Sequence, residues 1–259
     1  MTGAQGKNWC EDFFDDHFAE QHLVRTGQKG LGGIISFLEK KLHLQPGHKI
    51  FDQCCGVGGL SIPLAVQGYE VTGVDLIPSY IARARRDVRD AGVSGLFEVG
   101  DAHTYVVPEP CDAALNWWTS FGYAPDDRKN MQMLQCVRRS LKPGGWFALD
   151  YMNAPQRLKE FSGGTYASSE MKKNDCASIW ESHLDRANNM IVKNWRYRYA
   201  DGREIARQGG GAKLYTKDDL GKMFRSCGFG GISFYGSVKG EPLSDSSPRC
   251  IAVAQKNAS

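Results

Sequence analysis

A glycine turn with an acid on each side is the feature of this sequence most suited to chemistry. Residues 49–59 read Lys-Ile-Phe-Asp-Gln-Cys-Cys-Gly-Val-Gly-Gly, and Asp75 stands at the end of the next apolar run. In an open parallel sheet a ligand sits beyond the carboxyl ends of the strands. Glycines there let the backbone approach the ligand, and an acid about 20 residues on takes its ribose hydroxyls. The spacing therefore predicts a nucleoside-binding site.

The elements around this turn are predicted to be a strand, a helix and a second strand. They span Ile50 to Cys55, Leu60 to Gln67, and Glu70 to Asp75, which together form a compact β-α-β unit. The dinucleotide-binding fingerprint needs a third glycine at position 61, where this chain has Ser61. The hypothesis of a nicotinamide-dependent oxidoreductase is therefore disfavoured.

The pattern Asp52-x-Cys54-x-Gly56-x-Gly58 resembles the first motif of the class I S-adenosylmethionine (SAM) dependent methyltransferases. The family usually has glycine where this chain has Cys54. A thiol side chain is small enough for the turn, provided that the backbone angle is one that a residue with a Cβ tolerates. The resemblance implies that SAM binds at this turn and leaves as S-adenosylhomocysteine.

Three further segments resemble the same family, in the family's order. Leu96 to Ala102 looks like the third strand with its Gly-Asp-Ala ending, which implies that Asp101 binds the adenine amino group. Cys111 to Trp118 looks like the fourth strand, and Leu141 to Asp150 resembles the segment that leads into the fifth. Four ordered matches are much stronger evidence than one glycine turn.

An aromatic segment, Trp9 to Phe18, precedes the first strand, where the family folds a helix over the cofactor. Aromatic faces suit a sulfonium cation and the edge of adenine. The alternative is that these aromatic residues are core residues at helical spacing. The resemblance implies a set of cofactor contacts, namely Phe14, Phe18, Asp52, Cys54, Gly56, Gly58, Asp75, Leu76, Asp101, Ala102, Asn116 and Trp117.

The carboxyl-terminal part completes the expected sheet. Thr216 to Asp219 is typical of a capping box before a helix from Leu220 to Cys227, and two strands follow at 231–238 and 249–256. In the family the seventh strand lies antiparallel between the fifth and sixth. The resemblance thus implies an α/β fold, a doubly wound seven-stranded Rossmann-like sheet with a reversed last strand.

Alternating aromatic and polar residues between Gly164 and Leu214 predict an antiparallel β lid, with a turn at Asn188-Asn189. The expected organisation has four parts. They are an N-terminal helical cap over the cofactor (1–48), the SAM-binding core (49–153), the lid insertion (154–214), and a final helix with the last two strands (215–259).

Methyl transfer from a sulfonium requires the protein to align a nucleophile with the S–CH3 bond and to exclude water. An acceptor that is a phenol, acid or ammonium also needs a base, and the candidate bases are His183, His17 and Tyr151. The predicted substrate contacts are Trp118, Tyr123, Asn153, Trp180, Trp195, Tyr197 and Arg198. A substrate carboxylate has Arg25, Arg198 or Arg249 as candidate partners.

Composition excludes several other classes of function. The chain has 259 residues, of which 41% are hydrophobic, and it has no apolar run long enough for a membrane span and no secretory signal; we expect a cytoplasmic protein. Its eight cysteines lack C-x-x-C spacing and its six histidines lack H-x-x-x-H spacing. Structural thiols and no metal site are therefore expected.

A nucleic-acid partner is disfavoured. The net charge is only +3, and acids at 87 and 90 are mixed with the arginines of residues 83–90, as on an ordinary solvated helix face. Enzymes that methylate exocyclic amines of bases typically show Asn/Asp-Pro-Pro-Tyr/Phe after the fourth strand, whereas residues 116–119 read Asn-Trp-Trp-Thr.

The leading hypothesis is a SAM-dependent methyltransferase that acts on a small acceptor, aromatic or amino-acid-like. The alternatives are an RNA methyltransferase and a non-catalytic SAM-binding subunit or sensor, because fold alone does not choose among them. The sequence leaves open whether oxygen, nitrogen, carbon or sulfur is methylated, and it leaves open the oligomeric state.

Overall fold

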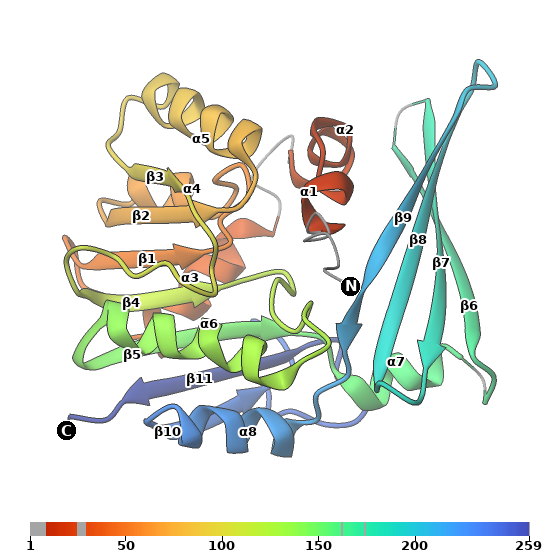
Figure 1. The fold of residues 1–259 in the computed structure, drawn as a ribbon. Helices are drawn as coiled ribbons and strands as arrows, with labels where there is room; N and C mark the ends of the chain where they lie inside the picture. Colours follow the sequence, from red (N-terminus) through yellow and green to blue (C-terminus); the bar gives the residue numbers. More distant parts are fainter. Residues whose placement is uncertain (1–8, 25–29, 162, 174, 259) are drawn as a thin grey trace, which may run out of the picture.

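The computed structural model describes residues 9–24, 30–161, 163–173 and 175–258, so Arg25 lies outside the described residues. It has two sheets side by side (Figure 1). The larger sheet has the strand order β10-β11-β5-β4-β1-β2-β3. Its strands are β1 (Lys49–Gln53), β2 (Glu70–Asp75), β3 (Leu96–Val99), β4 (Cys111–Asn116), β5 (Leu141–Tyr151), β10 (Phe229–Tyr235) and β11 (Cys250–Lys256).

Strands β1 to β5 pair parallel with one another, and β11 pairs antiparallel with both β5 and β10. The predicted seven-stranded sheet with its reversed last strand is therefore confirmed. The carboxyl ends of β1, β2 and β4 lie along one edge of the sheet, which faces the smaller sheet in Figure 1.

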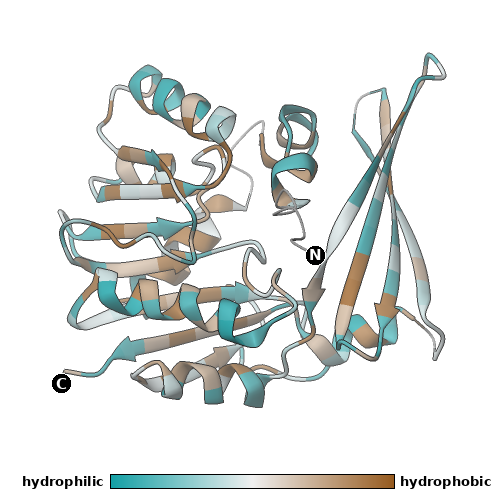
Figure 2. Cartoon of the chain, viewed as in Figure 1, coloured by the Kyte–Doolittle hydropathy of each residue, from teal (hydrophilic) through white to brown (hydrophobic). Residues whose placement is uncertain are grey.

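Helices cover both faces of the large sheet, because successive strand residues point to opposite sides. Ile50 packs with the helices α3 (Leu31–Lys41) and α4 (Ser61–Val66), whereas Phe51 packs with the helices of the other face. The remaining helices are α5 (Pro78–Asp90), α6 (Asp127–Ser140), α7 (Ala154–Lys159) and α8 (Lys217–Ser226). Figure 2 shows hydrophobic residues along the central strands and hydrophilic ones on the outer helix surfaces.

The capping box predicted at Thr216 is present. The Thr216 hydroxyl accepts from the Asp219 backbone N–H, and the Asp219 carboxylate accepts from the Thr216 N–H. These contacts start α8 at Lys217, which is three residues earlier than the first helical residue predicted.

The smaller sheet, called the lid, consists of β6 (Tyr166–Lys173), β7 (Cys176–Asp185), β8 (Met190–Tyr199) and β9 (Glu204–Lys213) in that order. All its pairs are antiparallel, and Trp180 stands opposite Trp195. Because side chains alternate across a strand, one lid face turns toward the large sheet and the other toward solvent.

A short helical segment, called the cap, lies between the two sheets (Figure 1). It comprises α1 (Trp9–Phe13), α2 (Asp16–Phe18) and the π-helical turn Ala19–Leu23. Helix α3, which also belongs to the expected cap of residues 1–48, packs on a face of the sheet through its apolar stripe. No helix among the described residues is long and apolar enough to cross a membrane.

Candidate active site

The glycine turn after β1 has three residues in the left-handed region. Cys54, Gly56 and Gly58 have φ angles of 64°, 57° and 80°. Cys54 thus keeps the backbone conformation of the glycine that it replaces, although this region is unfavourable for a residue with a Cβ. The turn therefore has the shape of a glycine turn despite the departure from the motif.

Asp75 is fixed beside this turn by two backbone donors. The Gly56 N–H donates to Asp75 Oδ2 at 2.9 Å, and the Ile77 N–H donates to Oδ1 at 3.1 Å. Burial raises the pKa of Asp75, and these backbone hydrogen bonds oppose the rise. A carboxylate has about four acceptor positions, so Asp75 can accept from further donors such as hydroxyl groups.

Asp101, at the loop after β3, is held by His103. Its Oδ1 accepts from the His103 N–H at 2.9 Å and lies 2.7 Å from His103 Nδ1, and this contact lowers the pKa of Asp101. The side chain remains 47% exposed. Burial, followed by the nearby carboxylates of Asp75 and Asp101, raises the pKa of Cys10 to about 12. Cap helix α1 therefore lies close to both acids.

The loop after β4 is strained and firmly held. Trp118 and Thr119 both have a φ of 61°, a conformation that costs energy and recurs at functional sites. Asp150 Oδ2 accepts from the Trp118 N–H at 3.1 Å, and Arg249 binds both Asp150 oxygens and the Thr119 hydroxyl. The Trp118 ring lies beside Gly59, so this loop adjoins the glycine turn.

Aromatic side chains from three elements gather between the cap and the lid. Phe14 stacks on Tyr123 with ring centroids 5.9 Å apart, and Phe13 and Phe18 contact Trp195 edge to face. Trp195 in turn packs against Trp180 and Tyr197 on the inner face of the lid. The residues Tyr123, Trp180, Trp195 and Tyr197, all predicted substrate contacts, therefore lie in this part of the molecule.

Several predicted cofactor contacts lie beneath the turn. Asp52 is 3% exposed and accepts from the Ser61 hydroxyl at 2.5 Å, while burial raises its pKa to about 7. Asn116 donates to Gln53 Oε1, and Gln53 donates to the Ala102 carbonyl oxygen. These buried side chains hydrogen-bond to one another or to neighbouring residues, and they hold the backbone around the turn in place. Leu76 packs with cap residues and α5 beside it.

The structure places Trp117 elsewhere. Its ring is 4% exposed and packs toward Phe37 of α3, on a face of the sheet. The cofactor contact at Trp117 stays a prediction. Trp118 packs against the same apolar cluster, and its ring lies beside Gly59 of the glycine turn.

Two candidate bases lie away from this region. Tyr151 is fully buried, and its hydroxyl donates to the Lys213 carbonyl oxygen. His183 is exposed on the outer lid face, where its ring contacts Tyr166. The third candidate, His17, lies between cap and lid, with its ring against Tyr197 and near the Tyr199 hydroxyl.

Two predicted substrate contacts, Asn153 and Arg198, have protein partners in the structure. Asn153 is 3% exposed and donates to the carbonyl oxygens of Ser244 and Ser247, so it anchors the loop before β11. Arg198 points outward beside the inward Tyr197 and forms an ion pair with Glu204 at 2.8 Å. Strand parity explains this position.

The sequence interpretation missed the glycine run of β9. The register of β8 and β9 shifts between Val192 and Asn194, which places Gly209 and Gly210 opposite Lys193 as a β-bulge. A Cβ at Gly210 would overlap the indole ring of Trp9, and one at Gly209 would overlap the Lys193 carbonyl group. The run Gly209-Gly210-Gly211 was the only sequence signal for this bulge. Trp9, which packs against it, is about 200 residues away along the chain.

Replacing Gly210 by alanine is expected to weaken the docking of the cap. The added methyl group cannot share the space of the Trp9 ring, and such overpacking costs about 2 kcal/mol. Limited proteolysis of the cap should accelerate in Gly210→Ala. The matched control is Gly32→Ala, where a Cβ meets no atom within 4 Å. If both variants resist proteolysis like the parent, the proposed Trp9 contact is wrong.

The cap and lid should separate in acid. Burial, then the charges of Lys173 and His17, lowers the pKa of His22 to about 4, so folding favours neutral imidazole. Its contribution to stability is complete above the unfolded value of about 6.5 and is lost as the pH falls toward 4. Tryptophan fluorescence should report this change through Trp195, which contacts His22. In His22→Asn the fluorescence should depend less on pH. If its pH dependence equals that of the parent, His22 is not the group that titrates.

Comparison with known proteins identifies the family of this chain. A family model described as a methyltransferase domain matches residues 50–145. The uncharacterized methyltransferase sll0829 of Synechocystis sp. is 30% identical over 195 residues, which cover 70% of this chain and 85% of that protein. The chain belongs to the class I SAM-dependent methyltransferases. SAM is accordingly the cofactor of this methyltransferase.

Two other likenesses are narrower. The 23S rRNA (uracil(1939)-C(5))-methyltransferase RlmD of Shewanella amazonensis is 37% identical over 94 residues, which are 36% of this methyltransferase and 21% of RlmD. The solved structure of SAM-bound CalS10, an amino pentose methyltransferase from Micromonospora echinaspora, matches with a TM-score of 0.69 at 17% identity. The match covers 93% of this methyltransferase and 96% of the CalS10 chain, and at this identity the likeness concerns the fold.

Proposed function

We propose that this methyltransferase transfers the methyl group of SAM to a small planar acceptor held between the cap, the strained loop after β4 and the inner face of the lid. The observation that carries this proposal is the aromatic enclosure around Tyr123, Trp180 and Trp195, which adjoins the glycine turn through Trp118. Aromatic walls suit a planar substrate and exclude water.

The chemistry of the donor set fits SAM. Asp75 has free acceptor positions for two ribose hydroxyls, and the half-exposed Asp101 suits an adenine amino group. Asn116 Oδ1 is buried and has no partner among the described residues, so it can accept from the α-ammonium group. When bound, SAM supplies a methyl group on a positively charged sulfur, ready for displacement.

The residues of the chain then bind the cofactor, orient the acceptor and exclude water. Phe14 and Phe18 of the cap close the cofactor side, and Trp118 lies where the methyl group must meet the acceptor. His17 is the one predicted base that lies between cap and lid. Burial lowers its pKa, which keeps the imidazole neutral and able to accept a proton.

Two observations favour a small molecule over RNA. Two arginines of α5 are engaged by the protein itself, since Arg83 pairs with Glu20 and Asp87, and Arg85 donates to the Phe97 carbonyl oxygen. The likeness to RlmD is confined to a short part of both chains, whereas CalS10, with an amino pentose as its named substrate class, resembles the lid-bearing chain over 93% of its length.

The test is transfer of a labelled methyl group from SAM to separate small-metabolite, RNA and protein fractions of a cell extract. We expect label in the small-metabolite fraction, with none when the protein is boiled first. Label in RNA would overturn the proposal and make the arginines of α5 candidates for phosphate contacts. Cofactor binding without label in any fraction would favour a sensor or a non-catalytic subunit.

A further inference from the structure

Lys193 is an unusual cation on the inner face of the lid. Two other basic residues there bind the cap: Lys173 donates to carbonyl oxygens at the end of the π-helical turn, and Arg207 pairs with Asp15 at 2.6 Å. Lys193 lies on the same face, two residues from Trp195. In the described part of the chain, its ammonium group has no hydrogen-bond or ion-pair partner.

Small residues flank Lys193 on both neighbouring strands. Its register partner on β7 is Ser182, and on β9 the bulge of Gly209 and Gly210 stands opposite. Bulges re-aim side chains and are frequent beside active sites. The position therefore combines an ammonium group on the inner lid face with small residues on both neighbouring strands, two residues from Trp195.

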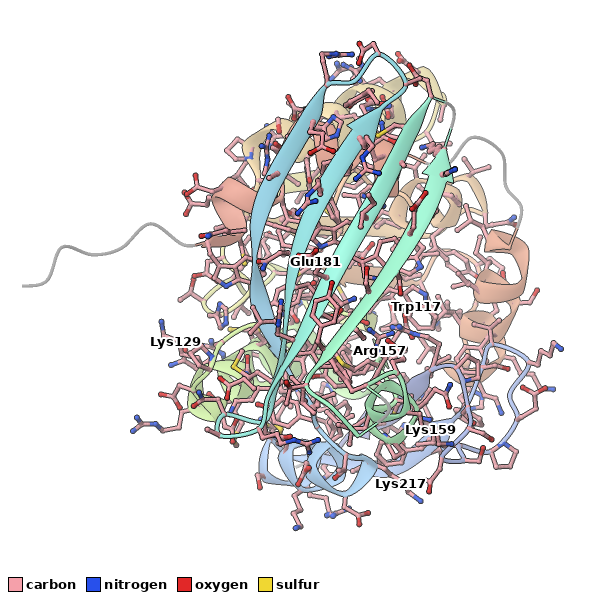
Figure 3. All side chains as sticks on the ribbon, turned by 90° about the vertical axis from the view of Figure 1, so that its right-hand side faces the viewer. Trp117, Lys129, Arg157, Lys159, Glu181 and Lys217 are labelled. Atoms are coloured by element: carbon pink, nitrogen blue, oxygen red, sulfur yellow. The ribbon has the colours of Figure 1, made fainter. Side chains whose placement is uncertain are left out.

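Two arginines near Lys193 disfavour its positive charge. Arg157 of α7 lies near the lower end of the lid in Figure 3, which views the lid from the outer side where Glu181 is labelled. Arg157 pairs with Glu160 through Nη1, while its Nη2 is buried without a partner among the described residues. Burial, and then Arg157, lowers the pKa of Lys193 to about 8; Glu160 opposes this and Arg249 adds to it.

Arg249 connects this cluster to the loop after β4. Its guanidinium is committed to Asp150, which also holds Trp118. Because Glu160 and Asp150 are paired with Arg157 and Arg249, the charge of Lys193 has no counterpart. Lys193 is partly buried. A cation partly withdrawn from water without a partner is costly, and a ligand anion would supply the missing partner.

We propose that the acceptor carries a carboxylate on its planar body, and that Lys193 and the free Nη2 of Arg157 bind this carboxylate. The inference rests on the proposed function, because it names a group of the acceptor held in that same enclosure. An ammonium and a guanidinium on two different elements fix an anion's position and orientation, while Trp195 packs against the planar body.

The test compares benzoate with benzamide, which have the same shape but differ in charge. Binding of each is measured by ligand-observed NMR with the full chain saturated by S-adenosylhomocysteine. We expect benzoate to bind at least about tenfold more tightly than benzamide. Lys193→Met should abolish this preference, and Lys193→Arg should retain most of it, because only the second keeps a cation there.

Lys159→Met is the matched control, because Lys159 lies exposed on the same helix as Arg157 (Figure 3). It should keep the full preference for benzoate. Equal binding of the two probes by the parent, no binding of either, or a preference that survives in folded Lys193→Met would each overturn the inference. The readout needs no turnover, so it remains decisive if the labelled-methyl experiment finds an RNA acceptor or none.

Discussion

Replacing Asp75 by alanine is expected to weaken SAM binding about 10- to 150-fold. The reason is the loss of charge-assisted hydrogen bonds to the ribose hydroxyls, which are worth about 1.5 to 3 kcal/mol. The fold should survive, because burial raises the pKa of Asp75 and its removal relieves the cost of a buried charge. Isothermal titration calorimetry with SAM gives the affinity directly.

Two variants accompany this measurement. Asp75→Asn keeps one oxygen acceptor and should lie between the parent and Asp75→Ala. Asp90→Ala removes an exposed acid at the end of α5 and should bind SAM like the parent. Parent-like affinity in Asp75→Ala would show that the cofactor's ribose is bound elsewhere.

Asp150→Ala should lower the free energy of unfolding by about 3 kcal/mol. Asp150 is 4% exposed in its side chain and binds the Arg249 guanidinium through both oxygens. Removing one partner of a buried ion pair costs about 3 to 5 kcal/mol, and the lower figure applies because Arg249 is partly exposed. The variant also frees the Trp118 N–H, so the strained loop should relax and methyl transfer should slow.

Urea unfolding measures the first effect, and SAM turnover measures the second. Asp150→Asn keeps an oxygen for Arg249 or Trp118 and should be less destabilised. Asp201→Ala disrupts the exposed pair with Arg203 on a lid turn, so its unfolding should match that of the parent. An Asp150→Ala protein with parent-like stability and turnover would mean that this ion pair does not hold the loop.

The β-α-β unit around the glycine turn could be predicted closely. The second strand was predicted at 70–75, where β2 lies, and the first strand and the helix differ from the prediction by one or two residues at their ends. Apolar runs between glycines determine these elements locally. The reversed strand β11 could be predicted only through the family resemblance, because its pairing with β5 is a long-range contact.

The candidate site could be predicted less completely. Alternation along β8 places Trp195 and Tyr197 on one face and Arg198 on the other, so strand parity alone would have excluded Arg198. The burial of Tyr151 was not predictable, because it depends on its hydrogen bond to Lys213. The bulge at Gly209 and Gly210 depends on Trp9, which no local pattern connects to β9. The roles of the cofactor and substrate residues stay predictions.

A crystal structure of the full chain with S-adenosylhomocysteine tests the central claim most directly. We expect the ribose at Asp75, the adenine at Asp101 beneath α1, and the sulfur directed toward Trp118 and the inner face of the lid. A sulfur directed away from the lid, or a ligand bound outside the carboxyl ends of β1, β2 and β4, would contradict the account.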